Sequence, residues 1–132
     1  MPAIAANHFT ILTDDLPTTL DFYAEFLALR PGPRPPFTFP GAWLYADGGK
    51  GPDPILHIIA GVQKERLVKG VLDHMAFSAV GLIETVKKLE QKGLKYSLGR
   101  QVETSVWQLF FHDPNGARVE LDFAADEPGP AR

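Results

Sequence analysis

The chain has 132 residues, 45% of them hydrophobic, so it can bury a core as one compact unit or as two small, closely packed halves. Its 13 basic and 16 acidic residues give a net charge of −3, which argues against a dedicated nucleic-acid binder. No apolar run approaches the roughly 18 residues of a membrane span, and no basic-then-apolar segment opens the chain, so we expect a cytoplasmic protein that contacts no membrane.

The first regular pattern predicts a strand over residues 4–13, with His8 and Thr10 on one face. A helix is expected over residues 16–28, because Asp15 can cap a segment whose apolar residues recur at helical spacing. The predicted apolar face of this helix consists of Leu16, Leu20, Tyr23 and Leu27.

A proline-rich segment follows and predicts a long irregular loop that contains Phe37 and Phe39. Within and after this loop, strands are expected at residues 43–45 and around His57.

The second half repeats this plan in a tidier form. A strand over residues 73–78, a helix over about 81–92 that stops at Gly93, and strands at 96–100 and 106–111 are expected. A turn over Asp113-Pro114-Asn115-Gly116 leads into a last strand. That strand alternates between a polar face of Arg118, Glu120 and Asp122 and an apolar face of Val119, Leu121 and Phe123. Residues 126–132 are expected to form a frayed tail.

The two halves also match in sequence. Asn7-His8-Phe9-Thr10-Ile11 recurs as Asp73-His74-Met75-Ala76-Phe77, and Ile55-Leu56-His57-Ile58-Ile59 corresponds to Arg118-Val119-Glu120-Leu121-Asp122. A duplicated unit folds into duplicated structure, so His8 should be equivalent to His74, and His57 to Glu120. Because the chain has no cysteine, a metal site must use imidazole and carboxylate ligands, which suit Fe, Mn, Ni, Co or Zn.

These motifs, together with Phe111-His112-Asp113-Pro114-Asn115-Gly116, resemble those of the vicinal oxygen chelate superfamily of glyoxalases, bleomycin-resistance proteins and extradiol dioxygenases. The resemblance implies an α+β fold in which two βαβββ modules, about 4–63 and 70–124, form an open, barrel-like single domain. It also implies a homodimer that acts on a small molecule and uses one divalent metal ion.

Carried over by position, His8, His74 and Glu120 match the two-histidine, one-carboxylate ligand set of the metal-using branches. His57 is either a fourth ligand or a neighbouring acid–base group, and Glu120 and His57 are the predicted catalytic residues. In the glyoxalase I arrangement, His8 and His57 of one chain would meet His74 and Glu120 of the other. The predicted substrate-binding residues are Thr10, Phe37, Trp43, Tyr45, Arg100 and Gln108.

The resemblance leaves three functions open. A fourth ligand favours glyoxalase- or epimerase-like proton transfer by a lyase or isomerase, and its absence leaves room for Fe(II) ring cleavage of catechols. A metal-free protein that sequesters a ligand is the third possibility. Leu12 and Gly61 stand where glutathione-using glyoxalases have arginine and asparagine, so glutathione is not expected to be the cosubstrate.

Overall fold

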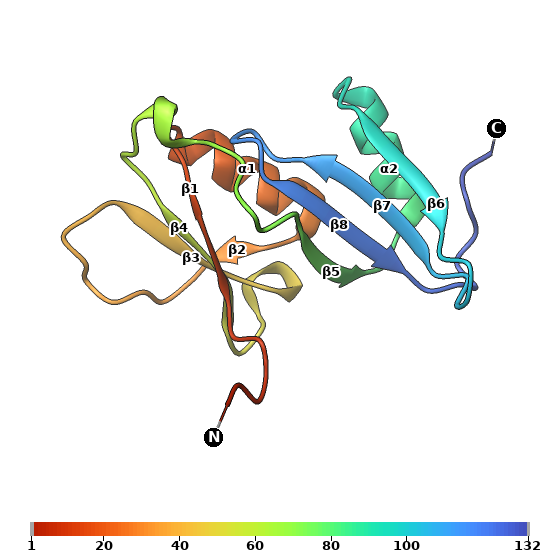
Figure 1. Ribbon diagram of the computed structural model, residues 1–132, viewed down its shortest axis with the longest axis horizontal. Coiled ribbons are helices and arrows are strands. Elements are labelled where there is room, and N and C mark those ends of the chain that lie inside the picture. The colour runs from red at the N-terminus through yellow and green to blue at the C-terminus, as the bar shows by residue number, and fades with distance from the viewer. Residues whose placement is uncertain (1, 132) are drawn as a thin grey trace. The chain divides into compact units, whose positions relative to one another are not determined.

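The computed structural model describes residues 2–131, and the chain divides into two compact units at the boundary between Val68 and Lys69. Each unit has the order strand, helix and three strands, as the sequence predicts (Figure 1). Among the described residues, no helix is long and apolar enough to cross a bilayer.

The first unit contains one helix and one four-stranded sheet. Its elements are β1 (Phe9–Leu12), α1 (Leu16–Leu27), β2 (Arg30–Pro31), β3 (Gly41–Tyr45) and β4 (Pro54–Ile59), with short 3₁₀ turns at Asp47–Gly49 and Lys64–Arg66. The strand order is β1-β4-β3-β2, and β1 runs parallel to β4 whereas the other pairs are antiparallel.

The second unit repeats this topology. Its elements are β5 (Met75–Ala79), α2 (Leu82–Gln91), β6 (Tyr96–Arg100), β7 (Trp107–His112) and β8 (Arg118–Phe123). The strands lie side by side in the order β5-β8-β7-β6, with β5 parallel to β8 (Figure 1). The fold is therefore α+β with two βαβββ modules, as predicted, and each sheet is open at its edges.

The strand registers show that the duplication extends to individual residues. Thr10 pairs with His57 in the first sheet, and Ala76 pairs with Glu120 at the same place in the second. His57 and Glu120 therefore occupy equivalent positions, as the sequence offsets predict.

Both predicted histidine-bearing strands begin later than expected. Pairing of β1 with β4 starts at Phe9, and β5 starts at Met75, so His8 and His74 each lie one residue before a strand. The prediction of a strand from residue 4 was wrong because alternation alone does not supply the neighbouring strand whose hydrogen bonds define a ladder.

The buried face of α1 also differs from the prediction. Thr19, Phe22, Tyr23 and Phe26 are buried, whereas Leu16, Leu20 and Leu27 are only partly buried. Both sets fit a helical period, and burying Phe22 and Phe26 removes more apolar area from water than burying leucines. In α2, by contrast, the predicted residues Leu82, Val86 and Leu89 are the buried ones.

Asp15 and Gly93 cap their helices as the sequence predicts, whereas the start of α2 is capped by a distant residue. The Asp15 carboxylate accepts a hydrogen bond from the Thr18 amide at 3.2 Å, and Gly93 takes the left-handed conformation (φ 68°) after α2. Gly81 precedes α2 and has no side chain with which to cap it. Instead, Glu127 accepts from the amides of Gly81 and Leu82 at 3.1 and 2.9 Å.

The expectation of a frayed C-terminal tail was therefore wrong for Glu127 and Gly129, and Arg132 lies outside the described residues. Besides the Glu127 carboxylate on α2, the Glu127 carbonyl accepts a hydrogen bond from Trp107 Nε1 at 2.9 Å. Gly129 lies so close to the Trp107 ring that an added Cβ would be 2.7 Å from it. A carboxylate at a helix N-terminus satisfies free amides and complements the helix dipole, which local composition does not reveal.

Replacing Glu127 with alanine is expected to lower the free energy of unfolding by about 1 kcal/mol, because the first turn of α2 loses its cap. Urea denaturation followed by circular dichroism measures the change. The exposed neighbour Asp126 supplies a control, since Asp126→Ala should stay within about 0.5 kcal/mol of the wild type. Equal stabilities of Glu127→Ala and Asp126→Ala would contradict the capping role.

Candidate functional site

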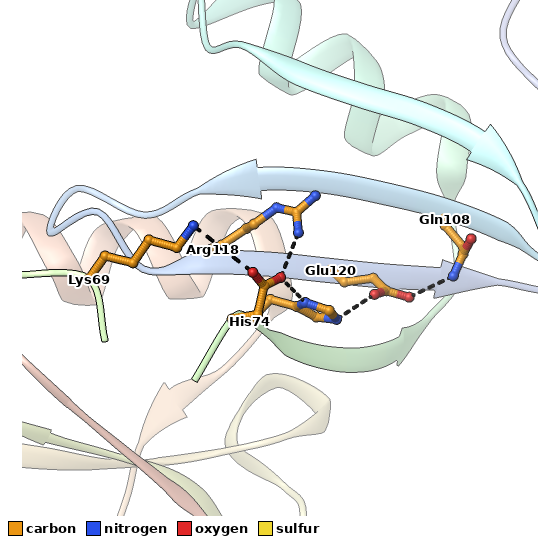
Figure 2. Close-up of polar contacts among 6 residues, drawn as sticks. Lys69, His74, Gln108, Arg118 and Glu120 are labelled. Atoms are coloured by element: carbon orange, nitrogen blue, oxygen red, sulfur yellow. Dashed lines mark hydrogen bonds and ion pairs between the residues drawn. The ribbon is translucent and has the colours of Figure 1, made fainter. Parts of the chain in front are cut away.

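A chain of polar contacts runs along one face of the second sheet, from Arg118 to Gln108 (Figure 2). Val119, Leu121 and Phe123 of β8 are buried in the core, so the strand's alternation turns Arg118 and Glu120 to the opposite face.

His74 lies at the centre of this chain. Its Nε2 is 2.9 Å from Glu120 Oε1, and its Nδ1 is 2.8 Å from Asp73 Oδ2 (Figure 2). Phe110 of β7 meets the His74 ring edge to face at 5.5 Å between centroids. The imidazole is therefore held between two carboxylates, with the nitrogen farther from its backbone directed at Glu120.

Glu120 is only 5% exposed, which is costly for a carboxylate unless it is paired. Its two oxygens face different partners: Oε1 meets His74, and Oε2 accepts a hydrogen bond from Gln108 Nε2 at 3.2 Å. Gln108, predicted to bind substrate, thus positions Glu120 in this structure.

Asp73 contacts His74, and Arg118 in turn contacts Asp73. Arg118 Nη1 donates to Asp73 Oδ2 at 2.8 Å, and its guanidinium lies over the Phe110 ring at 4.2 Å. The hydrogen bond with His74, followed by that with Arg118, lowers the pKa of the Asp73 carboxyl. Asp73 is therefore a fixed anion, and its role was missed although it occupies the same place as Asn7 in the repeated motif.

Asp122, two residues beyond Glu120, was also missed as a functional candidate. Its Oδ1 is buried and has no hydrogen-bond partner among residues 2–131. Burial, then a hydrogen bond with Glu120 and the charge of Glu120, raise the pKa of Asp122 to about 6, and His74 opposes this shift. The sheet face thus carries two adjacent carboxyl groups that cannot both ionise without cost.

Replacing Asp122 with asparagine is expected to stabilise the metal-free protein at pH 8. The pKa of Asp122 is higher in the folded chain than its ordinary value of 3.8, so the folded state holds the proton more tightly and stability falls as pH rises from about 4 to about 6. The asparagine side chain of the variant does not titrate, so the advantage should be roughly 1–2 kcal/mol above pH 6 after allowance for partial solvent screening.

Urea unfolding with EDTA at pH 4 and pH 8 measures this difference. The stabilities of wild type and Asp122→Asn should converge at pH 4, where the Asp122 carboxyl is largely protonated in the folded chain. A difference that is independent of pH, or a less stable variant at pH 8, would contradict the shifted pKa.

In the first unit, three rings form a stack. His57 lies between His8 and Trp43, with centroid distances of 3.7 and 4.2 Å and interplanar angles of 12° and 14°. The sheet register explains half of this arrangement, because Trp43 of β3 pairs directly with His57 of β4. His8 Nδ1 is 2.7 Å from Asn7 Oδ1, the counterpart of the Asp73 contact.

His57 Nε2 is buried and finds no hydrogen-bond partner among residues 2–131. Burial, and then the neighbouring His8, lower the pKa of His57, while a hydrogen bond with the Pro54 backbone opposes the shift. The ring is therefore neutral near pH 7. A buried nitrogen without a partner is costly, which makes His57 a candidate functional residue.

The other predicted substrate residues fall into two groups. Thr10 is exposed beside His57 in the register, and Phe37 is 42% exposed with its ring 6.1 Å from Trp43. Tyr45 and Arg100 are instead engaged with the backbone. Tyr45 donates to the Pro33 carbonyl at 2.6 Å, and Arg100 donates to the Ser105 and Ala125 carbonyls while lying over Trp107.

His74 and Glu120 fit a divalent cation, although no group of three or more potential ligands converges within residues 2–131. Two ligands of one first-row ion, each about 2.1 Å from it, are about 3 Å apart at a right angle, close to the 2.9 Å between Nε2 and Oε1. The Asp73 contact at Nδ1 also matches the support that metal-bound histidines usually have. A metal ion held by this pair would need at least one further ligand.

With this geometry, the chain can be placed among known proteins. It belongs to the Glyoxalase/Bleomycin resistance protein/Dioxygenase superfamily, whose family model matches residues 5–121. Members of this superfamily act on small molecules, commonly dimerise, and include proteins that use a divalent metal.

Three individual proteins that are similar to this chain are described by name. The chain is 31% identical over 123 residues to "Glyoxylase I 4" of Arabidopsis thaliana, covering 87% of this chain and 68% of the plant protein. A mutant of the fosfomycin resistance protein FosX from Listeria monocytogenes, complexed with Mn(II) and 1S,2S-dihydroxypropylphosphonic acid, shares the fold with a TM-score of 0.69 at 15% identity, covering 94% of this chain and 93% of FosX. A glyoxylase/bleomycin resistance protein/dioxygenase domain from Frankia sp. gives 0.68 at 18% identity, covering 94% and 99%.

Proposed function

We propose that the protein is a metal-dependent enzyme that binds two neighbouring oxygens of a small molecule and transfers a proton, as glyoxalases and epimerases do. The observation that carries this proposal is the pair of the half-buried His74 and the buried Glu120, with Nε2 and Oε1 2.9 Å apart and both side chains held by outer partners. The FosX relative supports it, since its structure combines Mn(II) with a ligand that has hydroxyls on adjacent carbons.

In this proposal His74 and Glu120 hold the cation, and His8 is the third ligand, supplied from the same chain or from a second copy. When bound, a divalent ion stabilises negative charge that develops on substrate oxygens. The Nδ1 of His8 faces Asn7, so Nε2 would be its metal-binding atom.

We assign proton transfer to His57 rather than a place among the ligands. An imidazole binds a metal ion that lies in the plane of its ring. The His8 and His57 rings are stacked, with centroids 3.7 Å apart and planes nearly parallel. One ion therefore could not lie in both ring planes and close to both rings. The lowered pKa leaves His57 neutral and able to accept a proton. Moving a proton between adjacent carbons of the substrate needs no oxidant or reductant.

The substrate in this proposal carries a planar or apolar part beside its two oxygens. Trp43 continues the stack from His57, and the exposed Phe37 ring lies next to it, whereas Thr10 adds a hydroxyl on the adjoining strand. Leu12 and Gly61 offer no group that binds a glutathione carboxylate, so a glutathione adduct is not the proposed substrate despite the glyoxalase name of the plant relative.

The test loads metal-free protein with Mn, Co, Ni, Zn or Fe(II) and follows deuterium uptake into a panel of α-hydroxycarbonyl compounds by NMR. Metal-dependent uptake is expected, and His57→Gln should lower its rate by about 10²–10⁴ without changing metal affinity. A preparation that never takes up a stoichiometric ion would refute the metal enzyme and leave a ligand-sequestering protein.

One observation favours a second candidate, Fe(II) cleavage of a catechol ring. If His57 is not a ligand, a site of His8, His74 and Glu120 keeps an additional coordination position open, which suits two co-substrates. Oxygen consumption by anaerobically loaded Fe(II) protein on addition of catechols, without deuterium uptake from α-hydroxycarbonyls, would select this reaction instead.

A further inference from the structure

The two pseudo-equivalent histidines do not have equivalent support. His74 Nδ1 faces a carboxylate, Asp73, at 2.8 Å, whereas His8 Nδ1 faces a neutral amide, Asn7, at 2.7 Å. The duplication makes these two contacts counterparts. They differ in the group that faces the Nδ1 atom, which is a carboxylate at His74 and an amide at His8.

A second difference accompanies the first. Arg118 donates to Asp73 at 2.8 Å, and its counterpart in the first half of the repeat is Ile55, which has no charge to offer. Arg118 is in turn held over the Phe110 ring, whose edge-to-face contact steadies His74. The carboxylate and the guanidinium that orients it are thus present together in one copy and absent together from the other.

We infer that Asp73 is a positioning residue that makes the second unit the dominant half of the metal site, so that His74 and Glu120 capture the cation first and His8 joins as the weaker, more easily released ligand. This inference rests on the proposed metal-binding function. A carboxylate partner makes an imidazole a stronger metal ligand and fixes the orientation of its ring. An amide oxygen carries no full charge, so its effect on ligand strength and orientation is smaller.

The geometry of His74 and Glu120 supports the inference that the second unit binds the cation first. The unbound pair is already at ligand separation, 2.9 Å, and Gln108 holds the second oxygen of Glu120 so that the carboxylate need not reorganise. Preorganised ligands lose less conformational freedom when an ion binds. In the first unit, His8 is more exposed than His74, and among residues 2–131 its side chain contacts Asn7 and the His57 ring.

The test compares Asp73→Asn, which recreates the Asn7 arrangement, with Asn7→Ala as the matched control. Mn²⁺ affinity is measured on the full chain by electron paramagnetic resonance of the free ion. We expect Asp73→Asn to weaken Mn²⁺ binding by about tenfold or more, and Asn7→Ala by no more than about threefold. Because Asp73 is exposed, both variants should fold, which circular dichroism verifies.

A second measurement separates positioning from general destabilisation. In ¹⁵N NMR spectra of the metal-free protein, the His74 ring resonances should shift in Asp73→Asn and in Arg118→Met, while those of His8 remain in place. Equal affinity losses in Asp73→Asn and Asn7→Ala, or a larger loss in Asn7→Ala, would overturn the inference. Absence of deuterium exchange in protein that shows the expected order of affinities would remove the proposed reaction and leave this inference standing.

Discussion

Replacing Glu120 with glutamine is expected to abolish stoichiometric binding of a divalent ion and to lower turnover by about a thousandfold or more. The amide keeps the volume of the side chain but loses the charge. Its N–H can donate to His74 Nε2 while its oxygen accepts from Gln108, so the substitution removes the charge and one carboxylate oxygen without requiring either contact to break. Metal content after dialysis, together with the deuterium-exchange assay, measures both effects.

Glu127→Gln is the matched control, because it removes a second carboxylate of the same unit whose partners are the amides of Gly81 and Leu82. This variant should retain its ion even if it loses some stability. Should Glu120→Gln bind Mn²⁺ as tightly as the wild type does, Glu120 would not be a ligand and the proposed function would lose its main support.

Replacing Gly41 with alanine is expected to lower the free energy of unfolding by about 3 kcal/mol or more and to displace Trp43 from His57. A Cβ at residue 41 would lie 2.1 Å from the Ile58 carbonyl oxygen of the adjoining strand, so β3 and β4 would have to separate locally. Trp43, two residues along β3, depends on that pairing for its place on His57. Urea denaturation and near-ultraviolet circular dichroism follow the two effects.

Gly99 offers the control, since it also lies in a strand, β6, and an added Cβ there would meet no atom of the described residues within 4 Å. Gly99→Ala should remain within about 0.5 kcal/mol of the wild type or gain slightly, because alanine restricts the unfolded chain. Similar losses for both variants would show that the close approach of residue 41 to Ile58 is not the cause.

Much of the fold was predictable because it depends on short-range patterns. Alternation identified β8 and the face that carries Glu120, and helical spacing identified the buried residues of α2. The repeat made His57 and Glu120 equivalent before any register was known, and the pairs Thr10–His57 and Ala76–Glu120 bear this out. The superfamily followed from the same motifs and is confirmed by the family model.

The candidate site was only partly predictable for a physical reason. Residue type identified His74 and Glu120 as possible ligands, but the roles of Asp73, Arg118 and Asp122 depend on contacts that burial and strand pairing create. Arg100 and Tyr45 show the converse, because polar groups predicted to face substrate are engaged by backbone carbonyls.

The amino-acid order by itself determined that this protein consists of two homologous βαβββ halves with imidazole and carboxylate groups at matching positions, since periodicity and repetition are local properties of a chain. Only the tertiary structure decided that Glu127 caps α2, that His57 is stacked between His8 and Trp43, and that Arg118 pairs with Asp73 beside His74. These three outcomes depend on distances of a few ångströms between residues remote in sequence or in different strands, and hydrogen bonding and burial energies are set at that scale.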